Sequence, residues 1–314
     1  MSRVLVTGAT GFVGRGSLRP LAERGFEVHA VARGRPPAEL EGLAVWHRAD
    51  LLAPAAAEAV IDEARPSHLL HLAWYTEHGD NWGSLENVRW VEASLLLLRR
   101  FAAAGGRRAV VGGTCAEYDW SRSLLSEAES PLVPATLYGA AKRGLHVVAE
   151  AVAARAGFEF AWGRIFFTYG PHEDQRRLVA SVARALARGE PAPSSHGRQV
   201  RDYLHVEDLA DALAALVAAE VTGAVNVAAG TSVSIREVVE LLGELSGRPE
   251  LVELGALPPR PGDPDELSAD VRRLRDEVGW RPSRSLEDGL RETLEWWRER
   301  TWGASAGVAA ETGT

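Results

Sequence analysis

The segment Arg3-Val-Leu-Val-Thr-Gly-Ala-Thr-Gly-Phe-Val-Gly14 decides the fold of this 314-residue chain. Its first part, Arg3–Thr7, is a short aliphatic run that predicts a strand buried on both faces. Three glycines spaced three residues apart follow at once, and the stretch up to about Gly25 has a helical pattern. A strand that leads through a glycine-rich turn into a helix is the opening unit of a parallel α/β sheet.

The glycine turn predicts a binding site for a dinucleotide. Glycine lets the backbone approach a diphosphate closely, and the helix end supplies unpaired N–H groups and a positive dipole. The spacing is G-x-x-G-x-x-G rather than G-x-G-x-x-G. Its position directly after the first strand indicates a cofactor contact by Gly8, Gly11, Phe12, Val13 and Gly14.

Strand-like and helical stretches alternate along the chain. Further strands are expected at residues 26–32, 43–47, 67–73, 107–112, 158–164 and 199–205. Helices are expected at 54–64, 82–104, 134–156, 175–188, 206–219, 234–246, 271–278 and 286–302. This rhythm predicts an α/β fold, a Rossmann-type doubly wound parallel sheet with helices on both faces.

The rhythm loosens after Gly170, which suggests a second unit. We expect a dinucleotide-binding domain over residues 1–170, with residues 199–230 returning to it. Residues 171–302 are expected to form a smaller, partly interleaved C-terminal substrate domain. The small and polar residues 303–314 are expected to be a disordered tail.

Composition excludes several classes of partner. The chain is 46% hydrophobic and 25% charged, with a net charge of −8, which does not recruit nucleic acid or an anionic membrane surface. Its apolar runs are too short to cross a bilayer, and a strand begins too early to leave room for a signal peptide. The lone Cys115 excludes an internal disulfide framework and is expected to be a small packed residue. We therefore expect a cytoplasmic protein with no nucleic-acid, membrane or metal partner.

The end of the second strand bears on the choice of dinucleotide. An NAD-binding protein usually places a carboxylate there for the ribose 2′-hydroxyl, but this chain reads Val31-Ala-Arg-Gly-Arg35. Arginine can bind a 2′-phosphate that a carboxylate would repel, so Arg33 favours NADP(H) over NAD(H). Asp50 and Leu51, after the third strand, are expected to lie against the adenine.

A tyrosine and the only lysine of the chain lie four residues apart. Lysine and arginine together number 35, and Lys142 is the single lysine. On a helix, Tyr138 and Lys142 share one face, and an ammonium beside a phenol lowers the pKa of the phenol. Such a tyrosine can serve as a proton donor or acceptor near neutral pH.

Several motifs together resemble the extended short-chain dehydrogenase/reductase family, in its nucleotide-sugar-modifying branch of the NAD-dependent epimerase/dehydratase type. The resemblance runs from Thr7 to about Trp297. It is carried by the glycine turn and by Asp50-Leu51, His71-Leu-Ala73, Gly113-Thr-Cys-Ala-Glu-Tyr118, Tyr138-Gly-Ala-Ala-Lys142, Arg164-Ile-Phe-Phe-Thr-Tyr-Gly-Pro171, Arg201-Asp-Tyr-Leu-His-Val206 and Arg260-Pro-Gly-Asp263.

The resemblance implies roles for individual residues. Tyr138 is implied as the general acid/base, Lys142 as the group that lowers its pKa and holds the nicotinamide ribose, and Thr114 as the donor to the reacting oxygen. Leu72, Ala73 and Asn87 match positions that usually line the cofactor. Arg201 and Arg260 match the clamp on the substrate's diphosphate. The sugar pocket is expected to include Trp74, Glu117, Phe167 and His172.

Departures from the family pattern narrow the reaction. Cys115 and Ala116 stand where sugar 4,6-dehydratases place Asp-Glu, which argues against dehydration. A Cys/His epimerisation like that of GDP-fucose synthase is weakened, because the cysteine position is Ala116 although His172 matches the histidine. Phe167 replaces the asparagine of the R-x-F-N motif, so the sugar is expected to sit differently.

The sequence therefore favours NADPH-dependent reduction of a nucleotide-linked 4-keto-6-deoxy sugar by a homodimer. A nucleotide-sugar 4-epimerase with retained NAD is the main alternative. Reduction of a carbonyl compound without a nucleotide, and a dinucleotide sensor without catalytic activity, are further alternatives.

Overall fold

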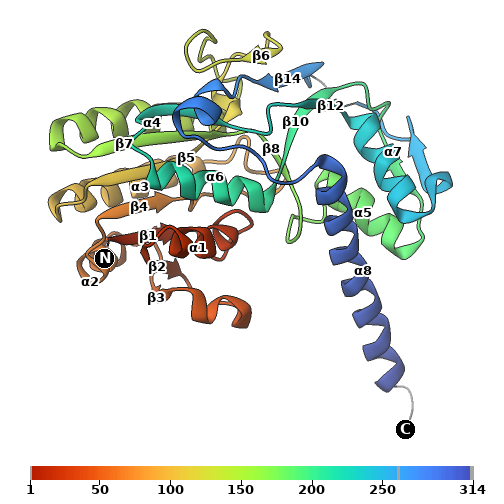
Figure 1. Ribbon diagram of the computed structural model, residues 1–314, viewed down its shortest axis with the longest axis horizontal. Helices are drawn as coiled ribbons and strands as arrows, with labels where there is room; N and C mark the ends of the chain where they lie inside the picture. The colour runs from red at the N-terminus through yellow and green to blue at the C-terminus, as the bar shows by residue number, and fades with distance from the viewer. Residues whose placement is uncertain (1, 260–261, 312–314) are drawn as a thin grey trace.

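The fold is built on a central parallel sheet. Figure 1 shows the computed structural model of the protein, which describes residues 2–259 and 262–311. The strand order of this sheet is β11-β7-β5-β4-β1-β2-β3, and every neighbouring pair is parallel. The strands are β1 (Arg3–Thr7), β2 (Glu27–Ala32), β3 (Val45–Arg48), β4 (His68–His71), β5 (Arg108–Thr114), β7 (Glu159–Ile165) and β11 (Gly223–Val227).

Helices cover both faces of the sheet (Figure 1). On one face, α1 (Gly14–Glu23) packs against α6 (Val206–Ala218), and their aliphatic side chains form one core with β1, β5 and β11. On the other face lie α2 (Pro54–Ala64), α3 (Glu86–Ala103) and α4 (Leu137–Ala156), which enclose a second core. The apolar stripe of each helix thus packs against the sheet. The predicted doubly wound α/β fold is confirmed.

A smaller unit is formed mainly by the C-terminal part of the chain. Its mixed sheet has the order β12-β10-β14-β6, with β8 paired to β10, and a separate ladder joins β13 to β9. The strands are β6 (Leu124–Leu125), β8 (Phe167–Tyr169), β9 (Ala192–Ser194), β10 (Val200–His205), β12 (Ser232–Ser234), β13 (Val252–Leu254) and β14 (Glu266–Ala269). Three helices share a core there, namely α5 (Leu178–Arg188), α7 (Ile235–Ser246) and α8 (Leu286–Glu311).

Two C-terminal expectations differ from the structure. The helix expected at 271–278 is only a π-helical turn at Arg273–Glu277. Where a disordered tail was expected from Gly303, α8 continues through Glu311, in keeping with four alanines in that stretch that favour helix. Residues 312–314 lie outside the described residues. Within the described ranges, no helix is long and apolar enough to cross a membrane.

Candidate active site

The glycine turn after β1 forms a cradle that side chains would fill. Gly8 has a φ of +70°, and a Cβ there would lie 2.8 Å from the Ala73 nitrogen. A Cβ on Gly14 would lie 2.2 Å from the Gly8 carbonyl oxygen. α1 begins here with no side-chain cap and no acidic residue in its first turn, so the positive end of its dipole faces the turn, although the N–H groups of Arg15 and Gly16 donate to the carbonyls of Gly11 and Val13. These features fit the diphosphate of a dinucleotide.

A hydrogen-bonded group that sequence reasoning missed joins this turn to β4. The Thr7 hydroxyl lies 2.6 Å from His71 Nδ1 and accepts hydrogen bonds from the N–H groups of Leu72 and Ala73, each at 3.2 Å. Burial lowers the pKa of His71 to about 3, so its imidazole is neutral. The backbone of Leu72 and Ala73 is thereby held beside Gly8, where the sequence placed the cofactor.

The expected adenosine side of the cleft lies at the ends of β2 and β3. Arg33 is exposed there and makes no ion pair with any described residue, whereas Arg35 is paired with Glu41 at 2.7 Å. Asp50 is exposed and its Oδ1 accepts the Leu52 N–H, while Leu51 is buried. Arg33 is therefore the guanidinium that remains available for a 2′-phosphate.

Asn87 differs from its predicted role as a cofactor ligand. Its side chain is fully buried, and its Nδ2 donates to the carbonyls of Asn81 and Ser84 at 2.7 and 2.8 Å. Its Oδ1 accepts the indole N–H of Trp74 at 2.9 Å. Asn87 therefore holds the segment between β4 and α3 in place instead of presenting its amide to a cofactor.

Thr114, Tyr138 and Lys142 occupy the carboxyl end of β5 and the first turns of α4. Burial raises the pKa of Tyr138 to about 12, and the hydrogen bond with Thr114 opposes that rise. Arg177, at the start of α5, also lowers the pKa of Tyr138 through its charge. Arg177 is a neighbour that the sequence did not single out, because it is one of many arginines.

Lys142 contacts a backbone carbonyl and an aromatic ring in this structure, and its lowering of the Tyr138 pKa stays a prediction. Lys142 Nζ donates to the Gly112 carbonyl at 2.7 Å and lies 3.7 Å from the centroid of the Trp74 ring. Burial lowers the pKa of Lys142 to about 7, although the carbonyl and the aromatic face both favour its ammonium form. The amine is thus directed at β5 and Trp74, and the pKa of the phenol is raised rather than lowered.

Glu117 supports Thr114 from beneath and is fully buried, so it does not face a sugar pocket. One carboxylate oxygen accepts the Thr114 N–H at 2.9 Å and the Trp162 indole N–H at 2.8 Å. The other oxygen accepts from Arg164 at 3.0 Å. The prediction of a substrate contact is therefore replaced by a positioning role, which the capping box between Thr114 and Glu117 makes explicit.

Cys115 is enclosed directly after Thr114. Burial raises the pKa of its thiol to about 12, so the group is a poor acid or base at neutral pH. The Cys/His epimerisation route accordingly gains no support from its environment.

His172 faces α8. It has a φ of +70°, and its ring contacts Trp296 edge-on with 4.9 Å between centroids. Burial lowers its pKa to about 4, with Arg15 and Arg300 adding to the effect. The structure thus uses His172 for packing between α8 and the rest of the chain, and not as the predicted substrate contact.

The predicted diphosphate clamp is seen only in part. Arg201 is buried, donates to the carbonyls of Val200 and Pro264, and pairs with Asp263 at 2.8 Å. Phe167 lies beside it, with 5.2 Å between its ring centroid and the guanidinium carbon. Arg260 lies outside the described residues. Arg201 would have to exchange Asp263 for a diphosphate before it could act as proposed.

Aromatic side chains surround Tyr138 and Lys142. The Trp74 ring covers Lys142, with 3.7 Å between Nζ and the ring centroid. The Trp82 ring meets the Tyr138 ring edge-on at 5.6 Å, and Trp120 meets Trp82 at 6.2 Å.

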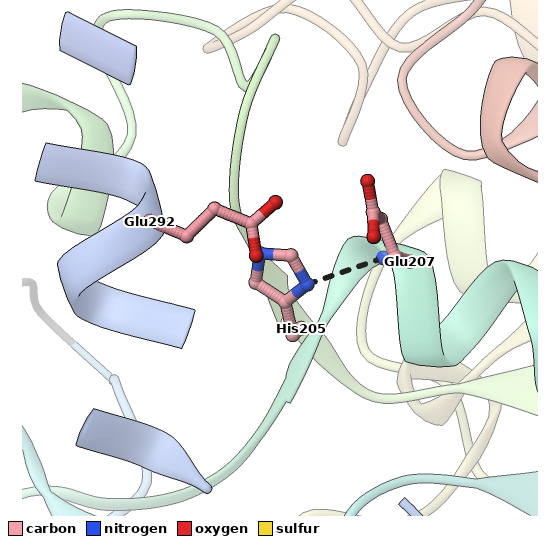
Figure 2. A group of neighbouring side chains, drawn as sticks. All are labelled: His205, Glu207 and Glu292. Atoms are coloured by element: carbon pink, nitrogen blue, oxygen red, sulfur yellow. Dashed lines mark hydrogen bonds and ion pairs between the residues drawn. The ribbon is translucent and has the colours of Figure 1, made fainter. Parts of the chain in front are cut away.

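A second charged cluster lies away from these residues. Figure 2 shows His205 between Glu292 of α8 and the start of α6, where its ring accepts the Glu207 N–H. The spacing of His205, Glu207 and Glu292 would suit a metal ion, but Arg284 donates to both glutamates. The guanidinium already supplies the positive charge, so the cluster joins α6 to α8.

The fold and the site together define a class of enzyme. A glycine-rich phosphate cradle at the start of a doubly wound sheet, with Thr114, Tyr138 and Lys142 at its carboxyl edge, is the arrangement of a short-chain dehydrogenase/reductase. Comparison with known proteins places the chain more narrowly.

Residues 4–228 match the NAD dependent epimerase/dehydratase family. UDP-glucose 4-epimerase of Azospirillum brasilense is 30% identical over 99% of this chain and 96% of its own length. dTDP-6-deoxy-L-talose 4-dehydrogenase (NAD(P)(+)) of Kitasatospora kifunensis is 32% identical over 93% and 94%. The solved structure of an NAD dependent NDP-hexosamine 5,6-dehydratase, TunA, superimposes with a TM-score of 0.82 and 30% identity, over 96% of this chain and 99% of that one. The chain belongs to the NAD dependent epimerase/dehydratase family.

Proposed function

We propose that this protein is an NADPH-dependent ketoreductase that acts on a nucleotide-linked 4-keto-6-deoxy sugar. The observation that carries the proposal is the placement of Thr114, Tyr138 and Lys142 together at the carboxyl end of β5, where burial raises the pKa of Tyr138 and keeps its phenol protonated at neutral pH. A carbonyl that accepts hydride becomes a much stronger base than a phenolate, so proton transfer from Tyr138 to it is downhill. The class of substrate is taken from the relatives, which are named for nucleotide sugars.

The residues divide the work between them. When bound, reduced nicotinamide would supply the hydride. Tyr138 donates the proton to the carbonyl oxygen, and Thr114, whose hydroxyl is close enough to Tyr138 to lower its pKa, stabilises the charge that develops on that oxygen. Glu117 and Arg164 fix the end of β5 from below, so Thr114 does not reorganise during the step. Lys142 lies between Gly112 and Trp74, on the side where the nicotinamide ribose is expected.

The choice of NADPH rests on Arg33. Its guanidinium is exposed at the end of β2, is not paired within the described ranges, and has no carboxylate beside it in the Val31–Arg35 sequence. A reductase needs a reductant that is exchanged at every turnover, which suits NADPH. A 4-epimerase returns the hydride to the same substrate and keeps its NAD. It is the second candidate function, because relatives with that name match nearly the whole chain.

The deciding experiment begins with the purified protein, which is denatured and assayed for released cofactor. The cofactor-free wild type is then titrated calorimetrically with NADPH and with NADH. The variants Arg33→Ala and Arg35→Ala are titrated in the same way as a matched pair. We expect no retained cofactor and a preference for NADPH that falls roughly 10- to 100-fold in Arg33→Ala alone, as loss of a charge-assisted hydrogen bond predicts. Retained NAD, or a preference for NADH, would instead favour the epimerase.

A turnover assay then tests the reaction. With NADPH and nucleoside diphosphate 4-keto-6-deoxyhexoses, we expect oxidation of the cofactor, and in Tyr138→Phe a loss of roughly 10²- to 10⁴-fold in kcat. Interconversion of UDP-glucose and UDP-galactose without added cofactor would contradict the proposal. Loss of Thr114, as Thr114→Val, is expected to lower kcat with less effect on KM.

We also propose a homodimer through α3 and α4, which pack side by side on one face of the sheet. Val88 of α3 and Val147 and Val148 of α4 are exposed, although each is an apolar residue within a helix. Light scattering after size exclusion is expected to give twice the chain mass of 33.8 kDa, and Val147→Glu is expected to shift it toward the monomer. A monomer at micromolar concentration would contradict this proposal.

A further inference from the structure

A row of three aromatic rings begins at the proposed proton donor. The Tyr138 and Trp82 rings meet edge-on, with 5.6 Å between centroids and an interplanar angle of 89°. Trp120 continues the row, 6.2 Å from Trp82. The outer members are not fully covered by protein: Trp82 retains 38% of its exposure and Trp120 is half-buried. Apolar ring surface therefore stays accessible beside the hydroxyl that is expected to reach the substrate.

The position of Trp82 is fixed by its neighbours. Its carbonyl oxygen accepts the Tyr138 N–H at 3.1 Å, and this bond ties the segment to the start of α4. The two carbonyls that Asn87 binds, those of Asn81 and Ser84, flank Trp82 in the sequence. Farther along the same segment, Glu77 pairs with Arg176 from the stretch before α5 at 2.7 Å. Trp82 is thus a fixed wall of the site, held from three directions.

The chemistry of this wall selects for a C–H surface. The faces of its rings carry no hydrogen-bonding group: the Trp120 indole N–H donates to the Cys115 carbonyl at 2.9 Å, and the Trp82 indole N–H lies at the ring edge. A sugar hydroxyl pressed against the face of Trp82 would lose its water without gaining a partner, whereas a methyl group would lose nothing. Rings of this kind bind the apolar edge of a ligand through burial of surface.

The reacting carbon has two neighbours in the sugar ring, and only one suits this wall. In a 4-keto-6-deoxy sugar, C3 carries a hydroxyl, while C5 carries the methyl group C6. We propose that Trp82 and Trp120 form the subsite for the C5–C6 edge of the sugar, and that they make the protein selective for a 6-methyl over a 6-hydroxymethyl group. This inference rests on the proposed function, since it takes the carbonyl carbon to lie at Tyr138.

Binding of matched sugars tests the inference without turnover. The folded protein, saturated with NADPH, which has no carbonyl to reduce in a sugar that carries a C4 hydroxyl, is titrated calorimetrically with UDP-6-deoxyglucose and UDP-glucose, and with the dTDP forms of both. We expect the 6-deoxy sugar to bind about tenfold more tightly, which is the discrimination that a single small group provides in an apolar pocket. Trp82→Ala is expected to reduce this ratio to within about twofold, and Trp82→Phe to keep most of it.

Two further variants serve as controls. Leu85→Ala removes a more exposed apolar side chain from the same segment and is expected to leave the ratio unchanged. Trp82→Gln places an amide in the wall and is expected to shift the preference toward the hydroxymethyl sugar. If Trp82→Ala does not fold, as judged by thermal unfolding, the Gln and Phe variants carry the test.

The outcomes separate the inference from the proposed function. Equal binding of the two sugars by the wild type, or a ratio that survives in the folded Trp82 variants, would overturn the inference. A protein that prefers the 6-deoxy sugar, loses that preference in Trp82→Ala, and yet fails to reduce any 4-keto sugar would keep the inference and overturn the proposed function. Binding of neither sugar would overturn both.

Discussion

In the proposed reduction Tyr138 acts as an acid, because its surroundings keep its phenol protonated. Burial is the largest influence on its pKa, and the neighbouring Cys115 and Glu117 raise the pKa further. The Thr114 hydrogen bond and the charge of Arg177 act in the opposite direction and do not cancel the effect of burial. In the oxidation of an alcohol the same group must first lose its proton, and only a small fraction of it is phenolate at neutral pH.

This asymmetry predicts opposite pH dependences for the two directions of the reaction. The Tyr138 pKa of about 12 lies above the working range, so the rate of ketone reduction should vary little between pH 6 and 9 on account of this group. The reverse oxidation requires the phenolate, whose fraction rises about tenfold per pH unit below the pKa. Initial rates of both directions, measured over that range, check the prediction. A rate of the reverse oxidation that does not rise with pH over this range would contradict it.

Glu117 and Arg164 form a buried ion pair whose loss should be costly. Removing one partner leaves the other charge buried without compensation, which typically costs about 3–5 kcal/mol. We therefore expect Glu117→Gln to lower the free energy of unfolding by roughly that amount, as measured by urea denaturation. The double variant Glu117→Gln/Arg164→Met is expected to recover part of the loss. A single variant as stable as the wild type would show that the pair contributes little.

The turn between β1 and α1 is the element on which cofactor binding depends most. A Cβ on Gly14 would lie 2.2 Å from the Gly8 carbonyl oxygen and 3.0 Å from Ala9 Cα. No flexible side chain can move aside here, because the atoms in the way are backbone. Gly14→Ala is expected to abolish detectable NADPH binding in calorimetry, with secondary structure retained by circular dichroism.

A matched glycine elsewhere provides the control for this prediction. A Cβ on Gly42 meets nothing within 4 Å, and its φ is not in the left-handed region. Gly42→Ala should therefore bind NADPH like the wild type. If Gly14→Ala also bound normally, the turn would have to rearrange without loss, and the cradle would not be the phosphate site.

Elements with strong local signals could be predicted from the sequence. Pro54–Ala64 was expected as a helix and is α2, since proline at its first position and an apolar stripe mark it. The strands β1, β2 and β5 were found because valine, leucine and alanine dominate their centres, as is typical of parallel strands buried on both faces. Short strands such as β8, β9 and β12 escaped, because three residues carry no period and their pairing is set by distant partners.

The site was predictable in its residues and less so in their contacts. Thr114, Tyr138 and Lys142 do meet around the end of β5. Glu117, Asn87 and His172 were expected to contact the cofactor or the substrate. In the structure the side chain of each contacts other groups of the protein. The sequence shows that a polar residue follows a strand. It does not show which buried donor or acceptor of the protein forms a hydrogen bond with that residue. The hydrogen bond between Thr7 and His71 was missed for the same reason, because the two residues lie 64 positions apart in the sequence.

The two parts of the molecule are joined by charge as well as by packing. Asp208 is buried at the start of α6, where it accepts hydrogen bonds from Ser283 and Arg284. Arg284 also reaches Glu292 of α8, and Trp280 donates to Asp211 of α6. The segment before α8 therefore fastens the helices of the smaller unit to α6, which itself lies against the central sheet. A movement of the smaller unit relative to the central sheet would have to break these bonds or move α6 with them.

Buried histidines make the whole fold sensitive to acid. Burial lowers the pKa of His71 to about 3 and the pKa values of His146, His172 and His205 to about 4. In the unfolded chain each would titrate near 6.5. Between about pH 6.5 and pH 4 the unfolded state therefore binds more protons at these four sites than the folded state does. Their contribution to stability is present above pH 6.5 and is lost as the pH falls through this window.

Two buried carboxyl groups act in the opposite direction. Burial raises the pKa of Glu173 to about 8 and that of Asp202 to about 7, so in the same window both hold a proton in the folded state only. In this window the unfolded state thus binds up to four more protons at the histidines, and the folded state binds up to two more at the carboxyl groups. The free energy of unfolding should still fall, by about 1–3 kcal/mol per pH unit.

One histidine can be isolated from this sum by substitution. The His205 ring is buried and its Nε2 has no hydrogen-bond partner among the described residues, so protonation there is opposed by loss of hydration. His205→Gln removes that proton from the balance. The variant should lose less stability than the wild type between pH 6.5 and pH 4.5, by about 1.4 kcal/mol per pH unit. Urea denaturation at several pH values measures both slopes, and equal slopes would show that His205 binds its proton as readily in the folded state as in the unfolded chain.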